Sequence, residues 1–222
     1  MKSPHYVEVF NKFGEPLIVT SLVPLPEETV YGNLLLKLIH IAQTIEYVNS
    51  KVETIFELFY KVRTPTSNLV EDMRNSSRIP ILERETEVAI YFVRRVVDEL
   101  ISLIYILQEN YPSQIKIDDI GKLLKAKDIK GDMKKIKDKY SGFLNQLNDI
   151  SNAYKHSFLN HEAAYNLLGR DEPLTLTISL KGNIIVNEFK FDSIALNDTL
   201  TLFDDFVNDC MEIFKGYTPK VK

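Results

Sequence analysis

A seven-residue repeat of apolar side chains constrains this sequence more than any other feature. Between residues 34 and 59, apolar residues recur at alternating steps of four and three. Such a seam runs along one side of an α-helix and packs lengthwise against another helix. We therefore predict a long helix from about Glu27 to Arg63, and the seam consists of Leu34, Leu38, Ile41, Ile45, Val48, Val52, Ile55 and Phe59.

The helical partner of this seam lies either in the same chain or in a second copy. A second long helix is predicted at about 81–109, after a loop-like stretch at 64–80. It is apolar around most of its circumference, which indicates a central position, and it carries Arg94–Asp98 and Arg95–Glu99 at i,i+4 spacing. We favour an antiparallel pairing of the two helices within one chain over an intermolecular coiled coil.

Three further helices are indicated by periodicity. One begins near Asp132 and carries apolar residues at helical spacing as far as Tyr154. A short one, HEAAYNLL, ends at Gly169, and the last spans about 197–215.

Two stretches indicate β-hairpins. LTLTISL alternates apolar and hydroxyl side chains, and KGN and IIVNEFKF follow it, which predicts a hairpin at about 174–191. HYVEVF and PLIVTSLV, separated by NKFGE, indicate a second hairpin at 5–23. The predicted fold is therefore mainly α, a four- or five-helix bundle with a hairpin before the C-terminal helix.

Length and pattern indicate a single domain over 1–222. The helical bundle core is expected at 27–168, the hairpin at 174–191 and the C-terminal helix at 197–215. Strands and helices do not alternate, so a parallel nucleotide-binding sheet is not expected.

Composition indicates a globular protein of the cytoplasm. The chain is 45% hydrophobic and 26% charged, and its net charge of −4 gives no global attraction to nucleic acid or anionic membranes. The start lacks the apolar core of a signal peptide, and Asp98 and Glu99 mark the most apolar helix as buried core instead of a membrane span. Cys210 is the only cysteine, which excludes an intrachain disulfide.

Several catalytic motifs are absent from the sequence. It has no GxGxxG or GxxxxGK[ST] phosphate loop, no GxSxG nucleophile elbow and no Glu-x-x-His pair. His156 and His161 are five residues apart and fall on different faces of one helix. We therefore expect no cofactor and no metal site.

A lysine-rich stretch runs from Lys122 to Lys139, with eight lysines against three aspartates. Such a stretch usually forms a solvated face, and it nearly lacks aromatic residues for base stacking. Pairing with the acidic C-terminal helix, within one chain or across a dimer, is an alternative. Whether the stretch binds phosphates stays open from the sequence.

The hexapeptide SNAYKH, residues 151–156, looks most like a functional site. Asn152 and His156 are one helical turn apart, and Lys155 is adjacent. An imidazole beside a cation suits general-base work on a phosphodiester. On residue types alone, a polar helix–helix contact is the favoured alternative.

The bundle, the apolar helix FVRRVVDELISLIYILQE and the SNAYKH hexapeptide together resemble the HEPN superfamily (higher eukaryote and prokaryote nucleotide-binding). The resemblance covers roughly 27–168. In its nuclease members the site reads Arg, a polar residue, three further residues and then His. The Arg and the His act together on RNA without a metal, usually at a dimer interface. Asn152 and His156 match that pattern, but Ser151 occupies the arginine position. A hydroxyl cannot replace the paired donors of a guanidinium. The resemblance therefore implies a member without nuclease activity.

We therefore expect a non-catalytic, HEPN-like binding or interaction protein, associated with RNA or a nucleotide in bacterial stress or phage defence. The alternatives are a metal-independent RNase that uses His156 and a structural bundle that binds a protein partner. Asn152, Lys155 and His156 are the expected binding residues, on an accessible surface. The seam, the family's habit and the opposed Lys and Asp/Glu faces lead us to expect a homodimer.

Overall fold

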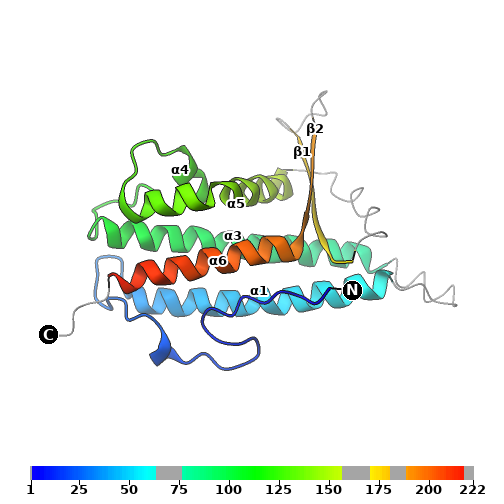
Figure 1. Cartoon of the computed structure of the whole chain (residues 1–222), viewed down its shortest axis with the longest axis horizontal. Helices are drawn as coiled ribbons and strands as arrows, with labels where there is room; N and C mark the ends of the chain where they lie inside the picture. Colours follow the sequence, from blue (N-terminus) through cyan, green and yellow to red (C-terminus); the bar gives the residue numbers. More distant parts are fainter. Residues whose placement is uncertain (1, 64–76, 157–170, 181–188, 218–222) are drawn as a thin grey trace.

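The computed structural model describes residues 2–63, 77–156, 171–180 and 189–217. Helices α1, α3, α5 and α6 run roughly along the long axis of the molecule, and a two-stranded hairpin stands at one end (Figure 1). The mainly α fold with a hairpin before the last helix is confirmed. In chain order the elements are η1 (Val19–Ser21), α1 (Leu34–Arg63), α3 (Ile79–Gln108), α4 (Ile120–Lys125), α5 (Gly131–His156), β1 (Leu174–Leu180), β2 (Phe189–Ala195) and α6 (Leu196–Lys215).

The heptad seam of α1 is buried along its whole length. Each of its eight residues is at most 2% exposed. The seam packs on α3 within the same chain, and Lys51 of α1 pairs with Glu85 of α3 at 2.8 Å. These contacts confirm the intrachain antiparallel pairing. Each apolar side chain buried there contributes about 1.5–3 kcal/mol of transfer free energy.

Helix α1 begins at Leu34, later than the predicted start at Glu27. A turn precedes it, in which the Thr29 hydroxyl donates to the carbonyl of Gly32, and Gly32 has a positive φ of 83°. The Asn33 side chain then accepts from the Leu36 N–H at 2.9 Å, which satisfies a free donor of the first turn. These local bonds, made by turn-forming residues, replace the helical turns that were predicted before the first residue of the apolar seam, Leu34.

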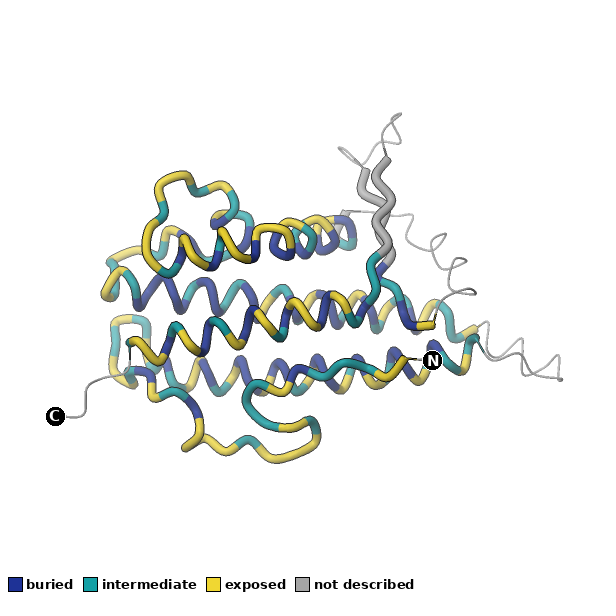
Figure 2. Tube along the Cα trace, viewed as in Figure 1, coloured by how far each residue is buried: buried dark blue, intermediate teal, exposed yellow. Residues whose placement is uncertain are grey.

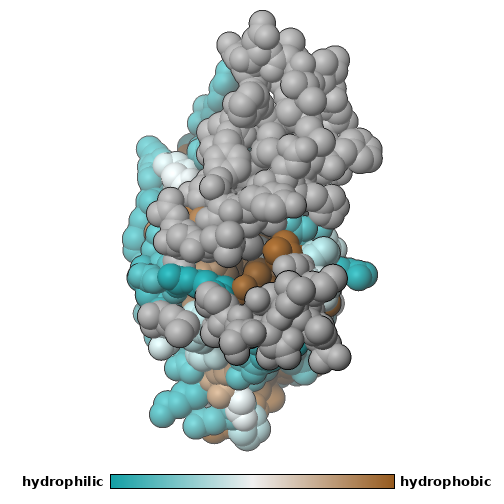
Figure 3. Space-filling view, turned by 90° about the vertical axis from the view of Figure 1, so that its right-hand side faces the viewer, coloured by the Kyte–Doolittle hydropathy of each residue, from teal (hydrophilic) through white to brown (hydrophobic). Residues whose placement is uncertain are grey.

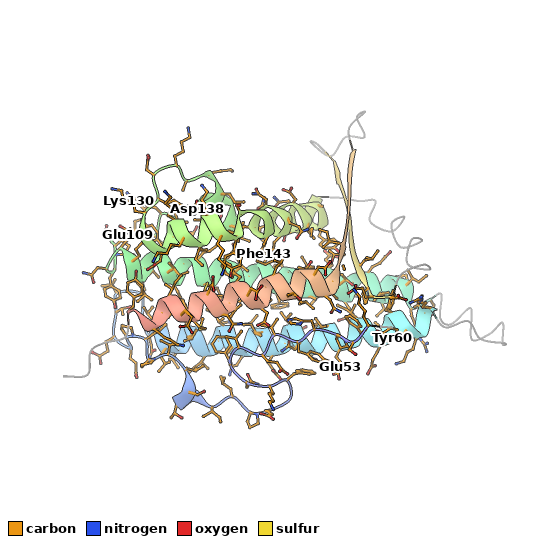
Figure 4. The ribbon with its side chains drawn as sticks, in the orientation of Figure 1. Glu53, Tyr60, Glu109, Lys130, Asp138 and Phe143 are labelled. Carbon is orange, nitrogen blue, oxygen red and sulfur yellow. The ribbon has the colours of Figure 1, made fainter. Side chains whose placement is uncertain are left out.

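Helices α5 and α6 pack through aromatic side chains. Phe206 of α6 contacts Tyr140 and Phe143 of α5, with ring centroids 5.2 and 6.0 Å apart, and Phe143 is labelled in Figure 4. Lys139 pairs with Asp209, so one lysine of the lysine-rich stretch pairs with the acidic helix inside one chain. In the tube view the buried positions of the long helices alternate with exposed ones (Figure 2).

The hairpin is confirmed, but its second strand lies later than predicted. Strands β1 and β2 are antiparallel, with Leu174 opposite Ala195 and Leu180 opposite Phe189. The hairpin was expected to end at 191, whereas β2 continues to Ala195 and passes directly into α6. Residues 181–188, and the helix predicted from HEAAYNLL, lie outside the described residues.

On the end of the molecule that Figure 3 faces, the described surface is mainly hydrophilic with a few hydrophobic residues near its centre.

The N-terminal hairpin predicted at 5–23 is wrong. Residues 2–10 instead form a segment that is neither strand nor helix, here called the N-terminal strap, which lies along α1 (Figure 1). Side-chain amides take the place of a partner strand: Asn49 of α1 accepts from the Val7 N–H and donates to the Val7 carbonyl, both at 2.9 Å. Asn197 of α6 bonds to His5 and Ser3 in the same way.

None of the helices in the described residues is both long and apolar enough to span a bilayer.

Candidate functional site

A groove with a volume of about 710 Å³ is lined by α1, α3, α5 and the connection between α3 and α4. This volume lies within the ~300–1,000 Å³ typical of small-molecule sites. We call it the α1–α3–α5 groove. Its apolar lining includes Leu36, Ile41, Ile90, Tyr91, Leu103, Ile106, Ile115 and Tyr154.

Helical periodicity places polar groups beside this apolar lining. On α1, Lys37 and Ile41 are one turn apart, as are Leu36 and His40, so α1 presents a mixed edge next to its buried seam. On α3, Tyr91, Arg95 and Asp98 follow one another at steps of four and three. One helix face therefore supplies an aromatic ring, a cation and an acid to the groove.

Two arginines of α3 connect the three helices. Arg94 Nε lies 3.6 Å from Asp98 Oδ2, and its Nη1 donates to Asn152 Oδ1 of α5 at 3.4 Å. Arg95 Nε donates to Glu99 Oε1 at 3.0 Å, so both predicted i,i+4 pairs form. These two guanidiniums sit at the edge of an apolar groove, where each keeps further N–H donors.

Arg95 also fixes the orientation of a histidine from α1. Its Nη2 lies 3.3 Å from His40 Nε2. Because a guanidinium only donates hydrogen bonds, His40 Nε2 is the acceptor and its proton resides on Nδ1. The exposed His40 ring therefore offers an N–H donor away from Arg95.

Burial shapes the ionisation of two groove residues. It raises the pKa of Asp98, although the Ile120 N–H, which donates to Asp98 Oδ1 at 2.8 Å, and the Arg94 guanidinium act in the opposite direction. Burial, together with the charges of Glu87 and Glu83, also raises the pKa of the Tyr154 phenol well above its ordinary range. Tyr154 is therefore a neutral hydroxyl near neutral pH, able to donate a hydrogen bond.

Of the predicted site residues Asn152, Lys155 and His156, the structure describes the side chain of Asn152. Asn152 is exposed, in agreement with the prediction, and is held by Arg94. Ser151 is buried, and its hydroxyl donates to the Leu147 carbonyl at 2.6 Å, so it serves its own helix. Lys155 and His156 form the last turn of α5, but their side chains lie outside the described part of the chain.

Sequence reasoning missed His40 and the role of both arginines in a site. A signal was present, because charged side chains are uncommon in a largely apolar helix and are usually paired where they occur. Among the residues that the structure describes, no three His, Cys, Asp or Glu side chains gather to hold a metal ion.

Comparisons of the chain with family models, curated proteins and solved structures give no match. Its class is therefore defined by its own structure, as a helical bundle with an arginine-edged groove of ligand size.

Asp98→Asn is expected to change how stability depends on pH. A raised pKa means that the folded protein binds this proton more tightly than the unfolded chain does. The carboxyl's contribution to stability therefore falls as pH rises from the ordinary value of 3.8 through the folded pKa. Asparagine keeps an oxygen for the Ile120 N–H but does not titrate.

Urea denaturation of both proteins, at several pH values between about 4 and 6, measures the effect. The free energy of unfolding of the wild type minus that of the variant should decrease as pH rises. The wild type and the variant have all other carboxyl groups in common, so the pH dependence of this difference comes from Asp98. A difference that increases with pH would contradict the effect of burial on Asp98.

Proposed function

We propose that this protein is a non-catalytic, HEPN-like binding protein that holds RNA or a nucleotide in the α1–α3–α5 groove. The observation that carries the proposal is that Arg94 and Arg95 line a mainly apolar groove of about 710 Å³. A guanidinium binds phosphate with paired, permanently charged donors. An apolar groove with a few convergent polar groups is the usual form of a small-ligand site.

The contacts of Arg94 suit exchange with a ligand. Its distances to Asp98 and Asn152, 3.6 and 3.4 Å, are longer than those of strong charge-assisted hydrogen bonds. A phosphate could therefore take over donors that are weakly used in the free protein. Tyr91, whose residue surface is 52% exposed, offers a ring on which a base can stack.

A setting in bacterial stress or phage defence follows only from the resemblance, and it remains part of the proposal. Genes that neighbour this one, such as a toxin or a phage gene, would test it.

The second candidate is a metal-independent RNase that uses His156. One observation favours it: although Ser151 occupies the arginine position of the motif, Arg94 brings a guanidinium to Asn152 from another helix. Incubation of RNA with the purified protein in EDTA tests this reading. Cleavage that disappears in His156→Ala would establish it against a purely binding role.

The third candidate function is a structural bundle that binds a partner through the heptad seam. The seam is not an exposed surface that a partner could bind. The seam is buried against α3, and Lys139 is engaged with Asp209 within the chain. Because the seam and Lys139 find their partners within one chain, we propose a homodimer from the resemblance alone. Light scattering at micromolar concentration would test it.

Arg95→Gln is expected to weaken the binding of nucleoside monophosphates by about tenfold to a hundredfold. A hydrogen bond to a charged group contributes about 1.5–3 kcal/mol, and glutamine lacks the charge and the fork of donors. Arg95 is exposed, so the substitution should leave the fold intact. Isothermal titration calorimetry with a panel of monophosphates measures the dissociation constants.

Arg84→Gln serves as the matched control, because Arg84 is also exposed on α3 but does not line the groove. Its affinity should equal that of the wild type. If no monophosphate binds the wild type, or if both variants bind equally well, the groove is not a nucleotide site.

A further inference from the structure

Positive charge is concentrated in one part of the fold. The stretch from Lys122 to Lys139 carries eight lysines and three aspartates, a net charge of +5 in a chain whose total is −4. It covers most of α4, the connection to α5 and the first turns of α5. The electrostatic potential of the molecule is therefore strongly uneven, which favours an anionic partner at this end.

Half of these lysines are already engaged. Lys122 pairs with Asp118, Lys135 with Asp132 and Lys139 with Asp209, while Lys137 Nζ donates to the Ala126 carbonyl. The other half have no ion-pair partner among the described residues, and all are exposed. We call them the lysine surface: Lys125, Lys127, Lys130 and Lys134. Lys130 projects from the connection between α4 and α5 in Figure 4.

The beginning of α5 adds to this positive potential. Helix α5 starts at Gly131, between Lys130 and Lys134, and its macrodipole places partial positive charge at that end. Four exposed lysines within ten residues of the chain are typical of surfaces that contact several phosphates.

Helix α4, which ends at Lys125, connects the lysine surface to the α1–α3–α5 groove. Asp118 lines the groove and is bound by Lys122 in the first turn of α4, and Ile115 of the same connection also lines it. A strand with one nucleotide in the groove would therefore leave it close to α4, where its backbone phosphates meet the free lysines.

We propose that the lysine surface binds the phosphodiester backbone of a single-stranded RNA whose nucleotide occupies the groove, an inference that rests on the proposed function. The groove binds one base and its phosphate, while the lysine surface contributes affinity without sequence preference. The only aromatic residue at the end of the stretch, Tyr140, is buried, so the contact is with the backbone instead of with stacked bases.

A membrane is the less suitable anionic partner. Interfacial binding needs apolar side chains beside the lysines, inserted among the lipids. The exposed large hydrophobic residues of the described chain all lie outside Lys122–Lys139: they are Ile18, Val19, Val30, Leu36, Tyr47, Ile81, Tyr91 and Leu202.

The test is a triple variant, Lys125→Gln, Lys127→Gln and Lys130→Gln, with the full chain. Binding of a fluorescent uridine oligonucleotide is followed by anisotropy between about 50 and 200 mM salt. The slope of log K against log salt should become shallower by about 2, since each lost phosphate contact removes about 0.7 for a single strand. Affinity at the lowest salt should fall at least ~10-fold.

The matched control removes three cations that lie elsewhere, through Lys12→Gln, Lys61→Gln and Arg84→Gln. It changes the net charge equally, and its affinity and salt slope should stay close to those of the wild type. The lysine variant should also bind nucleoside monophosphates as the wild type does.

Failure of this inference differs from failure of the proposed function. If the oligonucleotide binds the lysine variant and the wild type with the same affinity and slope, the lysine surface is not a backbone site, although the groove can still bind monophosphates. If the wild type binds vesicles of anionic phospholipid through these lysines and does not bind the oligonucleotide, the partner is a membrane and the inference is wrong. Absence of any monophosphate binding overturns the proposed function itself.

Discussion

Phe206→Ala is expected to lower the free energy of unfolding by about 3–5 kcal/mol, the usual cost of removing a fully buried phenylalanine side chain. Phe206 is 0% exposed and lies between α5 and α6. It meets Tyr140 edge-on and Phe143 at a tilt, so the substitution loses aromatic contacts as well as buried area. Urea denaturation followed by circular dichroism measures the loss.

Leu202→Ala is the control, one turn earlier on the same helix. Leu202 is 38% exposed, and a surface change of this kind should alter the unfolding free energy by about 0.5 kcal/mol or less. Equal losses in the two variants would contradict the aromatic packing of α5 on α6.

Periodicity allowed most of this fold to be predicted. The seam of α1 and the stripe of α6, from Leu196 to Phe214, repeat at helical spacing, and both are buried where the pattern placed them. Helix α4 could not be predicted in the same way. It has only six residues, too few to show a helical repeat. Its start depends on the Asp119 side chain, which accepts from the Lys122 N–H, and on Asp98, which accepts from the Ile120 N–H and lies 22 residues away.

The site was only partly predictable, because it joins helices that are distant in the sequence. The exposure of Asn152 followed from the helical wheel of α5, a local property. Its bond to Arg94 links residues 58 apart, and the contact between Arg95 and His40 links residues 55 apart. Local spacing shows the Arg–acid pairs of α3, but which helices face those arginines is decided by tertiary packing.

The N-terminal strap shows how an error in strand prediction arises. HYVEVF forms no strand, although its composition is β-rich, and the backbone hydrogen bonds of His5 and Val7 are made with side chains. A strand pattern predicts that N–H and C=O groups need partners, and it does not specify a second strand. Here the partners are amides from α1 and α6, 42 and 192 residues away.

Asn49→Ala should therefore destabilise the protein by about 2–6 kcal/mol. Asn49 is 1% exposed, and it satisfies both the N–H and the carbonyl of Val7, which is itself buried. Alanine leaves both backbone groups without a partner, at about 1–3 kcal/mol for each unmet buried group. The free energy of unfolding in urea measures the effect.

Asn197→Ala provides a matched comparison, because Asn197 makes the same pair of bonds to the strap, with the N–H of His5 and the carbonyl of Ser3. Asn197 is only half-buried, so water can replace its amide, and its loss should cost about 1 kcal/mol or less. The two variants remove the same side chain and the same kinds of bond, and differ mainly in burial. A cost that is equal at both positions would mean that burial of the Val7 backbone does not hold the strap to α1.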